Sequence, residues 1–356
     1  MPQSAVIIVN WNGGRHLPGC LSALAAQTER DFTVWVVDNG STDGSLDLLA
    51  RAAAGDWPLV STAYGPTPSA RDLPPLRLLV NSANAGFAAG NNRALRAALA
   101  DPAVAYCVPL NNDTVAHPDW LRALTATAAA HPQVGSLTGT LLFAGRPDRV
   151  ASAGISVHRD GLALDRGVGG AVADLSRTPQ PVFGVSAGAA LYRRELLADV
   201  GLFDAAFFSY LEDADLAWRA RLRGWRALWV PDAYVLHEVS ATGGQGSPFK
   251  NYHLARNRIW CLIKNLPSGL WARYAPYILR YDSLALLYGL ARRDWALIQG
   301  RAASLRDISL MMQQRRRIQA QRTVSDAHLA RLLAPALSPW TALRARRDVD
   351  ALLTER

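Results

Sequence analysis

Cysteine is scarce in this sequence. Only three cysteines, Cys20, Cys107 and Cys261, occur among its 356 residues, and no two of them form a CxxC pair. So few and so widely spaced thiols cannot build a disulfide framework or a cysteine-based zinc site. We therefore expect a protein of a reducing compartment, the cytoplasm.

Long hydrophobic runs are lacking as well. No stretch of about 18 clean apolar residues occurs, which is the length that a membrane-spanning helix needs. The opening residues, MPQSAVIIVN, carry neither the basic segment nor the cleavage site of a signal peptide. We expect no spanning helix and no leader, so that any contact with a membrane is peripheral.

Lysine is rare, and the positive charge is unevenly distributed. The formal net charge is +9, yet residues 246–356 hold 19 basic and 7 acidic residues, a balance of +12, whereas residues 1–245 have a balance of −3. A nucleic-acid-binding protein is one alternative for so basic a chain. The slightly acidic first part and the lack of a nucleic-acid motif speak against it, so we expect no nucleic-acid partner.

Apolar runs alternate with helical patterns through the first third of the chain. Such alternation predicts an α/β fold with a mostly parallel sheet and helices on both faces. Residues 135–190 predict short strands and loops. The expected strands open the segments 4–12, 32–45 and 76–100, and a fourth strand, which ends in polar residues, spans 105–114. The expected helices lie at 16–28, at 45–54, at the end of 76–100 and at Asp119–Ala130.

The composition changes near residue 246, where aromatic and aliphatic residues begin to mix with arginine at helical spacing. We therefore divide the chain into an α/β domain, 1–245, and a basic amphipathic helical region, 246–356. Arginine-rich helices with Trp, Tyr and Leu are typical of peripheral contact with an anionic membrane. A packed helical domain with a solvated arginine face, or a contact between subunits, is the alternative. The oligomeric state stays open.

Polar clusters follow the four expected strands. They are Asn10 with Asn12, Asp38–Asp43, Asn84–Asn92 and Asn111–Asp113. Ligands of parallel sheets bind outside the carboxyl ends of the strands, so these clusters predict a binding site at one edge. Ordinary turn formation is the alternative for the Asn-Gly and Asp-Gly pairs.

Two further features bear on a phosphate or metal ligand. Gly86 and Gly90 precede or open a helix, where backbone amides can meet a phosphate, although a structural turn explains them equally. Asp113 offers a hard oxygen ligand to Mg²⁺ or Mn²⁺, which also needs substrate phosphates and a second protein ligand. His237 in a strand-like run is a candidate, with an ordinary core or edge histidine as the alternative.

The segment SYLEDADLAWRARLRGW, residues 209–225, crowds three carboxylates before a helical pattern. Glu212, Asp213 and Asp215 fall in the first turn of the expected helix. Acidic side chains favour that position because they meet the positive end of the helix dipole. The alternative is that one of them is a catalytic base. The apolar face of this helix is predicted at Leu211, Ala214, Trp218, Leu222 and Trp225.

Seven motifs in fixed order resemble family 2 glycosyltransferases of the GT-A fold over about residues 4–260. They are VNWN, VVDNGSTDGS, NAGFAAGNN, LNNDT, SAGAALYRRELL, FDAAFFSYLEDADLAWRARLRGW and LHEVSATGG, and they are most similar to the rhamnosyltransferase and galactofuranosyltransferase branch. The resemblance implies a Rossmann-like GT-A domain and inverting transfer from a nucleotide diphosphate sugar. The expected donor is dTDP-rhamnose, and the expected sugar transferred is L-rhamnose. The implied acceptor is a saccharide or lipid-linked saccharide of cell-surface polysaccharide synthesis, at the cytoplasmic face of the inner membrane.

The resemblance also implies roles for single residues. Asp213 matches the catalytic base and Glu212 its acidic neighbour, while Asp113 and His237 match the ligands of Mg²⁺ or Mn²⁺. Asn111 replaces the first aspartate of the metal motif, so a nucleotide-sugar-binding protein without turnover is an alternative. Arg256 matches a diphosphate contact or, alternatively, is a surface or helix-capping residue. The residues implied at the nucleotide and donor sugar are Asn10, Asn12, Asp38, Asn84, Gly86, Gly90, Asn91, Asn111, Asn112 and Arg256.

Overall fold

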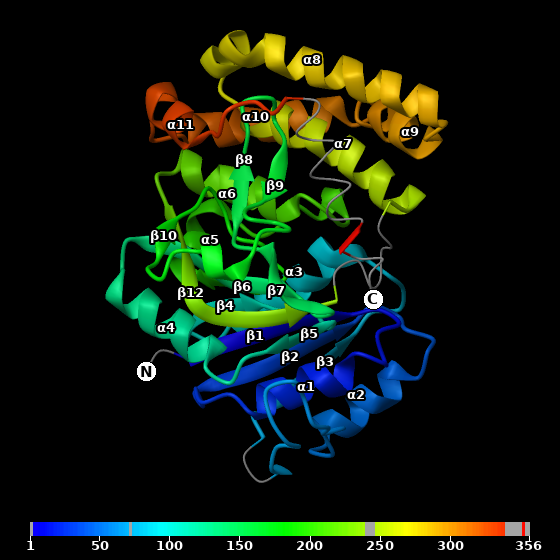
Figure 1. Ribbon diagram of the computed structural model, residues 1–356, viewed down its shortest axis with the longest axis vertical. Helices are drawn as coiled ribbons and strands as arrows, with labels where there is room; N and C mark the ends of the chain where they lie inside the picture. The colour runs from blue at the N-terminus through cyan, green and yellow to red at the C-terminus, as the bar shows by residue number, and fades with distance from the viewer. Residues whose placement is uncertain (1–2, 71–72, 239–245, 339–350, 353–356) are drawn as a thin grey trace.

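A mixed β-sheet crosses the centre of the protein and carries helices on both faces (Figure 1). The computed structural model describes residues 3–70, 73–238, 246–338 and 351–352. The strands are β1 (Gln3–Asn10), β2 (Phe32–Asp38), β3 (Leu76–Val80), β4 (Val104–Pro109), β5 (Thr114–Ala116), β6 (Val134–Phe143), β7 (Arg146–Ser152), β8 (Ile155–Val157), β9 (Ala163–Asp165), β10 (Gln180–Pro181), β11 (Ala190–Arg193) and β12 (Arg226–His237). The helices are α1 (Leu17–Ala25), α2 (Ser45–Ala53), α3 (Gly86–Leu99), α4 (Trp120–Ala130), α5 (Arg194–Val200), α6 (Glu212–Leu222), α7 (Pro248–Asn265), α8 (Ser268–Arg292), α9 (Trp295–Ala303), α10 (Ile308–Ala320) and α11 (Asp326–Leu332).

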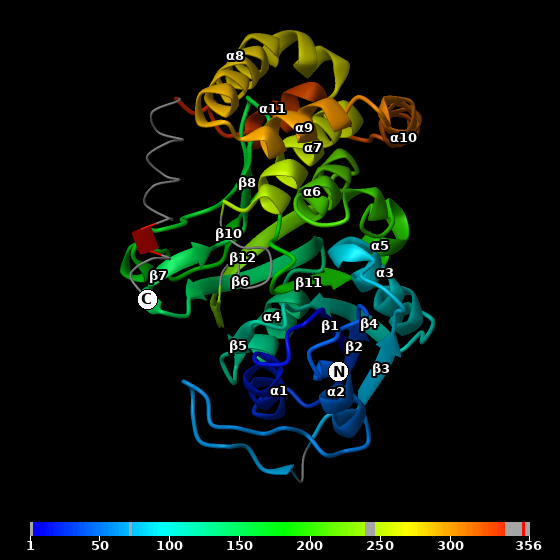
Figure 2. The same ribbon diagram turned by 90° about the vertical axis from the view of Figure 1, so that its right-hand side faces the viewer.

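The two faces of the sheet are covered by different helices because side chains alternate along a strand. On β1, Val6 and Ile8 join the core packed by α1, α2 and α4, whereas Ala5 and Ile7 join the core packed by α3 and α5. The two groups of helices lie on opposite sides of the sheet (Figure 2). The predicted α/β fold with helices on both faces is therefore confirmed.

The strand order is β10-β12-β6-β11-β4-β1-β2-β3. Strands β4, β1, β2 and β3 form one half of the sheet, and neighbouring strands in this half are parallel. In the other half, β6 is parallel to β12. The short β11 is antiparallel to both β4 and β6 and joins the two parallel halves. Because the polar clusters follow β1, β2, β3 and β4, the parallel half brings them to a common edge.

The structure differs from the predicted strands in two places. The fourth strand was expected to continue into residue 114, but β4 ends at Pro109 and the chain resumes as β5, which pairs antiparallel with β12. The intervening polar residues leave the sheet, with the amide of Asn111 donating to the carbonyl of Gly188. Within 135–190, β6 is a ten-residue, fully buried strand, because it lies between β11 and β12 in the sheet.

Helix α6 is buried on nearly every side. Ala214, Trp218 and Leu222 are buried, as the spacing predicted, but Arg219 and Arg221 are buried as well. Trp225 lies beyond the helix end and is half-buried. One apolar face was expected because the sequence does not show that the C-terminal helices cover the other side of α6.

Helices α7 to α11 form a layer over α6, with α8 outermost (Figure 1). Trp218 and Leu222 of α6 share a hydrophobic cluster with Leu262, Leu270 and Leu329 of this layer. The predicted helical region is therefore present and packs directly on the α/β part. Among the described helices, none is both long and apolar enough to cross a membrane.

Candidate active site

A buried hydrogen-bond network joins the loops that follow β1, β2 and β4. The side-chain amide of Asn10 donates to Asp38 (Nδ2–Oδ2 2.9 Å), and that of Asn112 donates to Asn10 (Nδ2–Oδ1 2.8 Å). Asn10 and Asp38 are fully buried. Three of the predicted polar clusters therefore meet at one edge of the sheet.

The loops after β1 and β2 also stabilise each other's turns. The second carboxylate oxygen of Asp38 accepts from the amide of Ser41 (2.9 Å), and the side-chain oxygen of Asn12 accepts from the amide of Thr42 (2.8 Å). Asn12 itself has a left-handed φ of 50°. Turn formation describes what Asp38 and Asn12 do here, and their contact with a nucleotide stays a prediction.

Asn39 connects the turn after β2 to the start of α3. Its buried side-chain amide donates to the carbonyl of Gly86 (3.1 Å) and to the side chain of Asn84 (3.4 Å). Its oxygen accepts from Asn81 (2.6 Å). The sequence placed Asn39 within the polar cluster Asp38–Asp43 but gave it no role of its own.

The two glycines of α3 are required by close packing. A Cβ on Gly86, whose φ is 83°, would lie 2.5 Å from the carbonyl oxygen of Phe208, and one on Gly90 would lie 2.8 Å from Val9. Asn91 donates to the carbonyl of Phe87 (2.9 Å), while its buried Oδ1 has no hydrogen-bond donor within the described residues. Close packing therefore explains why both positions are glycine, and Asn91 keeps one side-chain oxygen available to a ligand.

Asp113 and His237 are brought together by the pairing of β5 with β12, in which His237 lies opposite Thr114. Asp113 Oδ1 is 3.3 Å from His237 Nε2, and Asn111 Nδ2 is 3.2 Å from the same nitrogen. The side chains of Asp113 and His237 are nearly buried, at 8% and 14% exposed. Asp113 Oδ1 accepts no hydrogen bond from any described residue. A carboxylate oxygen and an imidazole nitrogen therefore converge where a cation fits.

Asp213 lies in the first turn of α6, next to Glu212. Its carboxylate accepts hydrogen bonds from the amides of Ala187 (3.2 Å) and Ala214 (2.8 Å). Burial raises the pKa of Asp213 to about 6, against the hydrogen bond from Ala187, and the charge of Asp165 acts in the same direction as burial. A carboxylate with such a pKa is ionised yet basic near neutral pH, as a general base requires.

Glu212 has a different environment. Burial and then the neighbouring charge of Asp213 raise its pKa well above the usual value. Its Oε2 is buried and has no hydrogen-bond partner among the described residues. Two adjacent carboxyl groups in a partly buried place do not ionise together easily, and the larger upward shift of the Glu212 pKa leaves Asp213 as the one that ionises first when the pH rises.

One short segment links Asp213 to the predicted metal motif. The amide of Ala187 donates to Asp213, and the carbonyl of the next residue, Gly188, accepts from the amide of Asn111 (2.9 Å). The carboxylate at the tip of α6 and the polar turn after β4 therefore border the same place.

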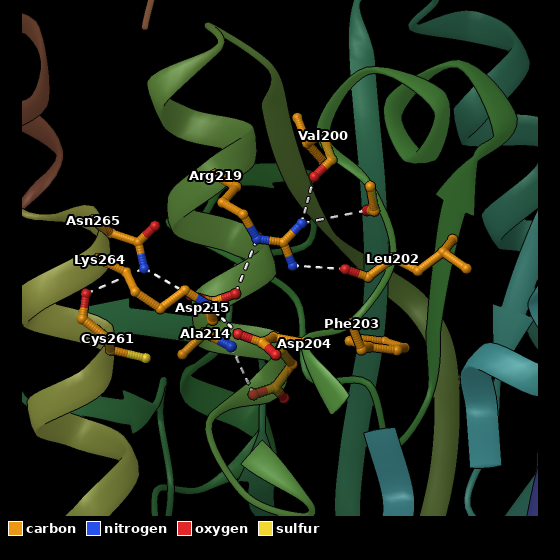
Figure 3. A network of polar contacts seen from close by, with 12 residues as sticks. Val200, Leu202, Phe203, Asp204, Ala214, Asp215, Arg219, Cys261, Lys264 and Asn265 are labelled. Carbon is orange, nitrogen blue, oxygen red and sulfur yellow. Dashed lines mark hydrogen bonds and ion pairs between the residues drawn. The ribbon is translucent and has the colours of Figure 1, made fainter. Parts of the chain in front are cut away.

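Asp215 belongs to a buried ionic network between α6 and α7 (Figure 3). Its carboxylate contacts Lys264 (2.7 Å) and Arg219 (2.9 Å) and accepts from Asn265 (2.8 Å). Lys264 also contacts Asp204 (2.6 Å). Burial opposes ionisation, but Lys264 and Arg219 overcome it and lower the pKa of Asp215 to about 2. The third carboxylate of the segment thus anchors α7 to α6.

The backbone directly before α6 is strained. Phe208 has φ 64° and ψ −66°, and the amide of Ser209 donates to the carbonyl of Phe207 (2.8 Å), which together define a classic γ-turn. Tyr210 and Leu211 follow with φ of 69° and 66°. Such conformations cost about 1–3 kcal/mol each and persist only where the surroundings enforce them.

Helix α7 supplies that enforcement. The side-chain amide of Asn257 donates to the carbonyls of Phe207 (3.0 Å) and Tyr210 (2.7 Å), and the guanidinium of Arg256 donates to the carbonyl of Phe207 (2.9 Å). Arg256 also stacks on Trp260, at 4.2 Å from the ring centroid. These contacts favour the structural alternative for Arg256, and its reach to a diphosphate stays a prediction. The sequence offered no signal for Asn257.

Comparison with known proteins identifies the family. The profile described as "Glycosyl transferase family 2" matches residues 5–201, and that described as "Glycosyl transferase family group 2" matches residues 107–341. The chain belongs to glycosyl transferase family 2. This glycosyltransferase is 30% identical to an N-acetylglucosaminyl-diphospho-decaprenol L-rhamnosyltransferase of Mycobacterium tuberculosis (strain H37Rv), with 83% of this chain and 98% of that protein covered.

Solved structures agree on the fold. The glycosyltransferase resembles the mannosyltransferase PcManGT of Pyrobaculum calidifontis, solved with GDP-Man and Mn²⁺, with a TM-score of 0.53, 18% identity and 99% and 87% of the two chains covered. It also resembles GalNAc-T7, solved with UDP, GalNAc and Mn²⁺, with a TM-score of 0.58, 16% identity and 89% and 54% covered. The predicted GT-A-like architecture with a C-terminal helical region is confirmed.

Proposed function

We propose that this glycosyltransferase transfers L-rhamnose with inversion from dTDP-rhamnose to a lipid-linked saccharide, with Asp213 as the base. The observation that carries the proposal is the position of Asp213: half-buried, with a raised pKa, and joined through Ala187–Gly188 to the turn that holds Asp113. The similarity to a decaprenol-linked rhamnosyltransferase over most of both chains supports the sugar and the acceptor class.

The reaction follows from this arrangement. The carboxylate of Asp213 accepts the proton of the acceptor hydroxyl, whose oxygen forms a bond to the anomeric carbon. The bond from that carbon to the diphosphate breaks, and its electron pair leaves on the terminal phosphate oxygen. Because the base and the leaving group lie on opposite sides of the sugar, the configuration is inverted.

The pair Asp113 and His237 fits a divalent cation, Mg²⁺ or Mn²⁺. No group of three His, Cys, Asp or Glu side chains with metal-site geometry occurs in the described ranges, so two protein ligands would be completed by the donor diphosphate and water. When bound, the cation supplies positive charge that stabilises the leaving diphosphate.

Excess EDTA is expected to lower sugar transfer by more than about 100-fold, because the charge of a metal ion contributes several kcal/mol to such a step. Added Mn²⁺ or Mg²⁺ should restore it. His237→Ala should raise the metal concentration needed for half-maximal rate, whereas His328→Ala on α11 should not. Undiminished turnover in EDTA would remove the metal from the proposal.

The donor is tested with a panel of nucleotide sugars, scored first by thermal stabilisation of the protein and then by release of nucleoside diphosphate. dTDP-rhamnose should stabilise the protein most and should be the donor that is turned over with a lipid-linked acceptor. Stabilisation without any release would instead favour the non-transferring binding protein that Asn111 suggested.

Helix α8 suits peripheral contact with an anionic membrane. Its outer side exposes Leu279, Leu287 and Leu290, between 56% and 65%, and Trp295 follows at 58%. The exposed charges of α8 are arginines, since Asp282, its only acidic residue, is paired with Arg258 and Arg301. An apolar stripe with cationic flanks is the pattern of a helix that lies in a membrane interface. The cytoplasmic face of the membrane remains our prediction.

The protein is expected to sediment with vesicles containing acidic phospholipid at low salt, and not with neutral phosphatidylcholine vesicles. Replacing Leu287 and Leu290 by Asp should weaken this binding at least about tenfold, since each buried leucine contributes about 1.5–3 kcal/mol. Equal binding of the double variant would mean that α8 does not contact the membrane. Another surface would then bind the vesicles, and a second copy of the chain could cover α8.

A further inference from the structure

Four aromatic side chains beside the first turn of α6 have no role in the chemistry described so far. Phe208 and His253 stack with ring centroids 5.5 Å apart, Phe249 meets His253 at 4.5 Å, and Tyr210 meets Phe249 at 6.2 Å. We call Phe208, Tyr210, Phe249 and His253 the aromatic wall. It is built from two segments, the strained backbone before α6 and the first turns of α7.

The aromatic wall borders both halves of the proposed active site. The carbonyl of Phe208 accepts from the amide of Ala88 (3.1 Å), which places it against the start of α3, where the donor sugar is expected. Tyr210 stands two residues before Glu212. Burial raises the pKa of Tyr210 to about 12, and the nearby carboxyl groups of Glu212 and Asp113 act in the same direction.

The wall is not an ordinary piece of core. Phe249 is 43% exposed, so part of its ring is accessible to a ligand. Phe208 and Tyr210 both have left-handed φ values, which α7 holds in place through Asn257. Backbone strain of this kind concentrates where side chains must be presented to a ligand. Exposure and strain therefore point independently to a binding role.

We propose that the aromatic wall is the binding site of the acceptor sugar, whose apolar ring face stacks on Phe249 and Tyr210. This inference rests on the proposed function. The hydroxyl that loses its proton must lie within hydrogen-bond reach of Asp213, so the group next to the base is the sugar ring and not the lipid chain. Lys250, whose ammonium is 5.6 Å from the centre of the Tyr210 ring, adds positive charge suited to the diphosphate that links sugar and lipid.

The test uses Phe249→Ala, because this ring is exposed enough to be removed without disturbing the fold. The acceptor probe is synthetic N-acetylglucosaminyl diphosphate with a short polyprenyl chain, and a second probe replaces the chain by a methyl group. We expect the acceptor KM to rise about tenfold for both probes, as loss of an aromatic contact predicts, while the KM for the donor stays unchanged. Phe249→Trp should restore the acceptor KM, and Tyr277→Ala, an exposed ring on α8, should leave it unaltered.

Three outcomes would overturn the inference. An unchanged acceptor KM in Phe249→Ala would show that the ring does not bind acceptor. A rise confined to the polyprenyl probe would assign the wall to the lipid chain, and a rise in the donor KM would assign it to the nucleotide sugar. If the unaltered protein releases no nucleoside diphosphate from any donor, the proposed function itself fails, which is a different result from all three.

Discussion

Asp213→Asn is expected to lower sugar transfer by about 10²- to 10⁴-fold, the usual contribution of a positioned general base. The amide cannot accept the proton of the acceptor hydroxyl, yet it keeps the size of the carboxylate and can still accept from the amide of Ala187. Binding of the nucleotide sugar, measured by thermal stabilisation, should therefore remain. Full activity in this variant would exclude Asp213 as the base.

The pH dependence gives the same assignment an independent check. A base must be ionised, so kcat/KM should fall about tenfold per pH unit below an apparent pKa near 6, the value to which burial raises Asp213. Because Glu212 lies adjacent, this apparent pKa belongs to the pair. Asp326→Asn, the same change in the first turn of α11, should alter neither the rate nor the pH profile.

Lys264→Met is expected to destabilise the protein by about 3–5 kcal/mol, because it removes the cation that pairs with Asp204 and leaves the buried Asp215 with Arg219 alone. Lys264 is 1% exposed and contacts both Asp215 and Asp204. The free energy of unfolding in urea measures the effect. The matched control is Arg322→Met, which breaks the partly exposed pair with Asp326 and should cost no more than about 1 kcal/mol.

The effect of Lys264→Met should depend on pH in a defined direction. The pKa of Asp215 is lowered from 3.8 to about 2, so the stabilisation by its ion pairs is present above pH 3.8 and is lost as the pH falls through about 2. The stability difference between the two proteins should therefore shrink in acid. A loss below about 1 kcal/mol at neutral pH would show that the network is not a structural anchor.

The prediction of the fold from sequence succeeded where local patterns decide structure. Continuous apolar runs become strands buried on both faces, as Val6 and Ile7 show by joining opposite cores. The polar clusters after these runs were placed at one edge correctly because parallel strands share their carboxyl ends. The end of β4 was misplaced because the residues after it pair with β12, more than a hundred residues later in the chain.

Within the candidate site, the sequence by itself determined which residue types stand at the sheet edge and at the tip of α6. The resemblance of its ordered motifs to family 2 glycosyltransferases implied roles for Asp213, Asp113 and His237. The sequence could not show how the environments of the three carboxylates of α6 differ. Their difference arises from neighbours distant in sequence: Ala187 donates to Asp213, whereas Lys264 neutralises Asp215.

Only the tertiary structure decided what the C-terminal helical region does at the site. Composition marked it as basic and amphipathic, yet Asn257 and Lys264 of α7 reach back to hold the strained backbone and the buried carboxylate of α6. Burial, pKa and backbone strain are set by what packs against a residue, and that partner is 40 to 60 residues away along the chain. For this reason the candidate reacting groups could be named from the sequence, while the contacts that raise the pKa of Asp213 and pair Asp215 with Lys264 could not.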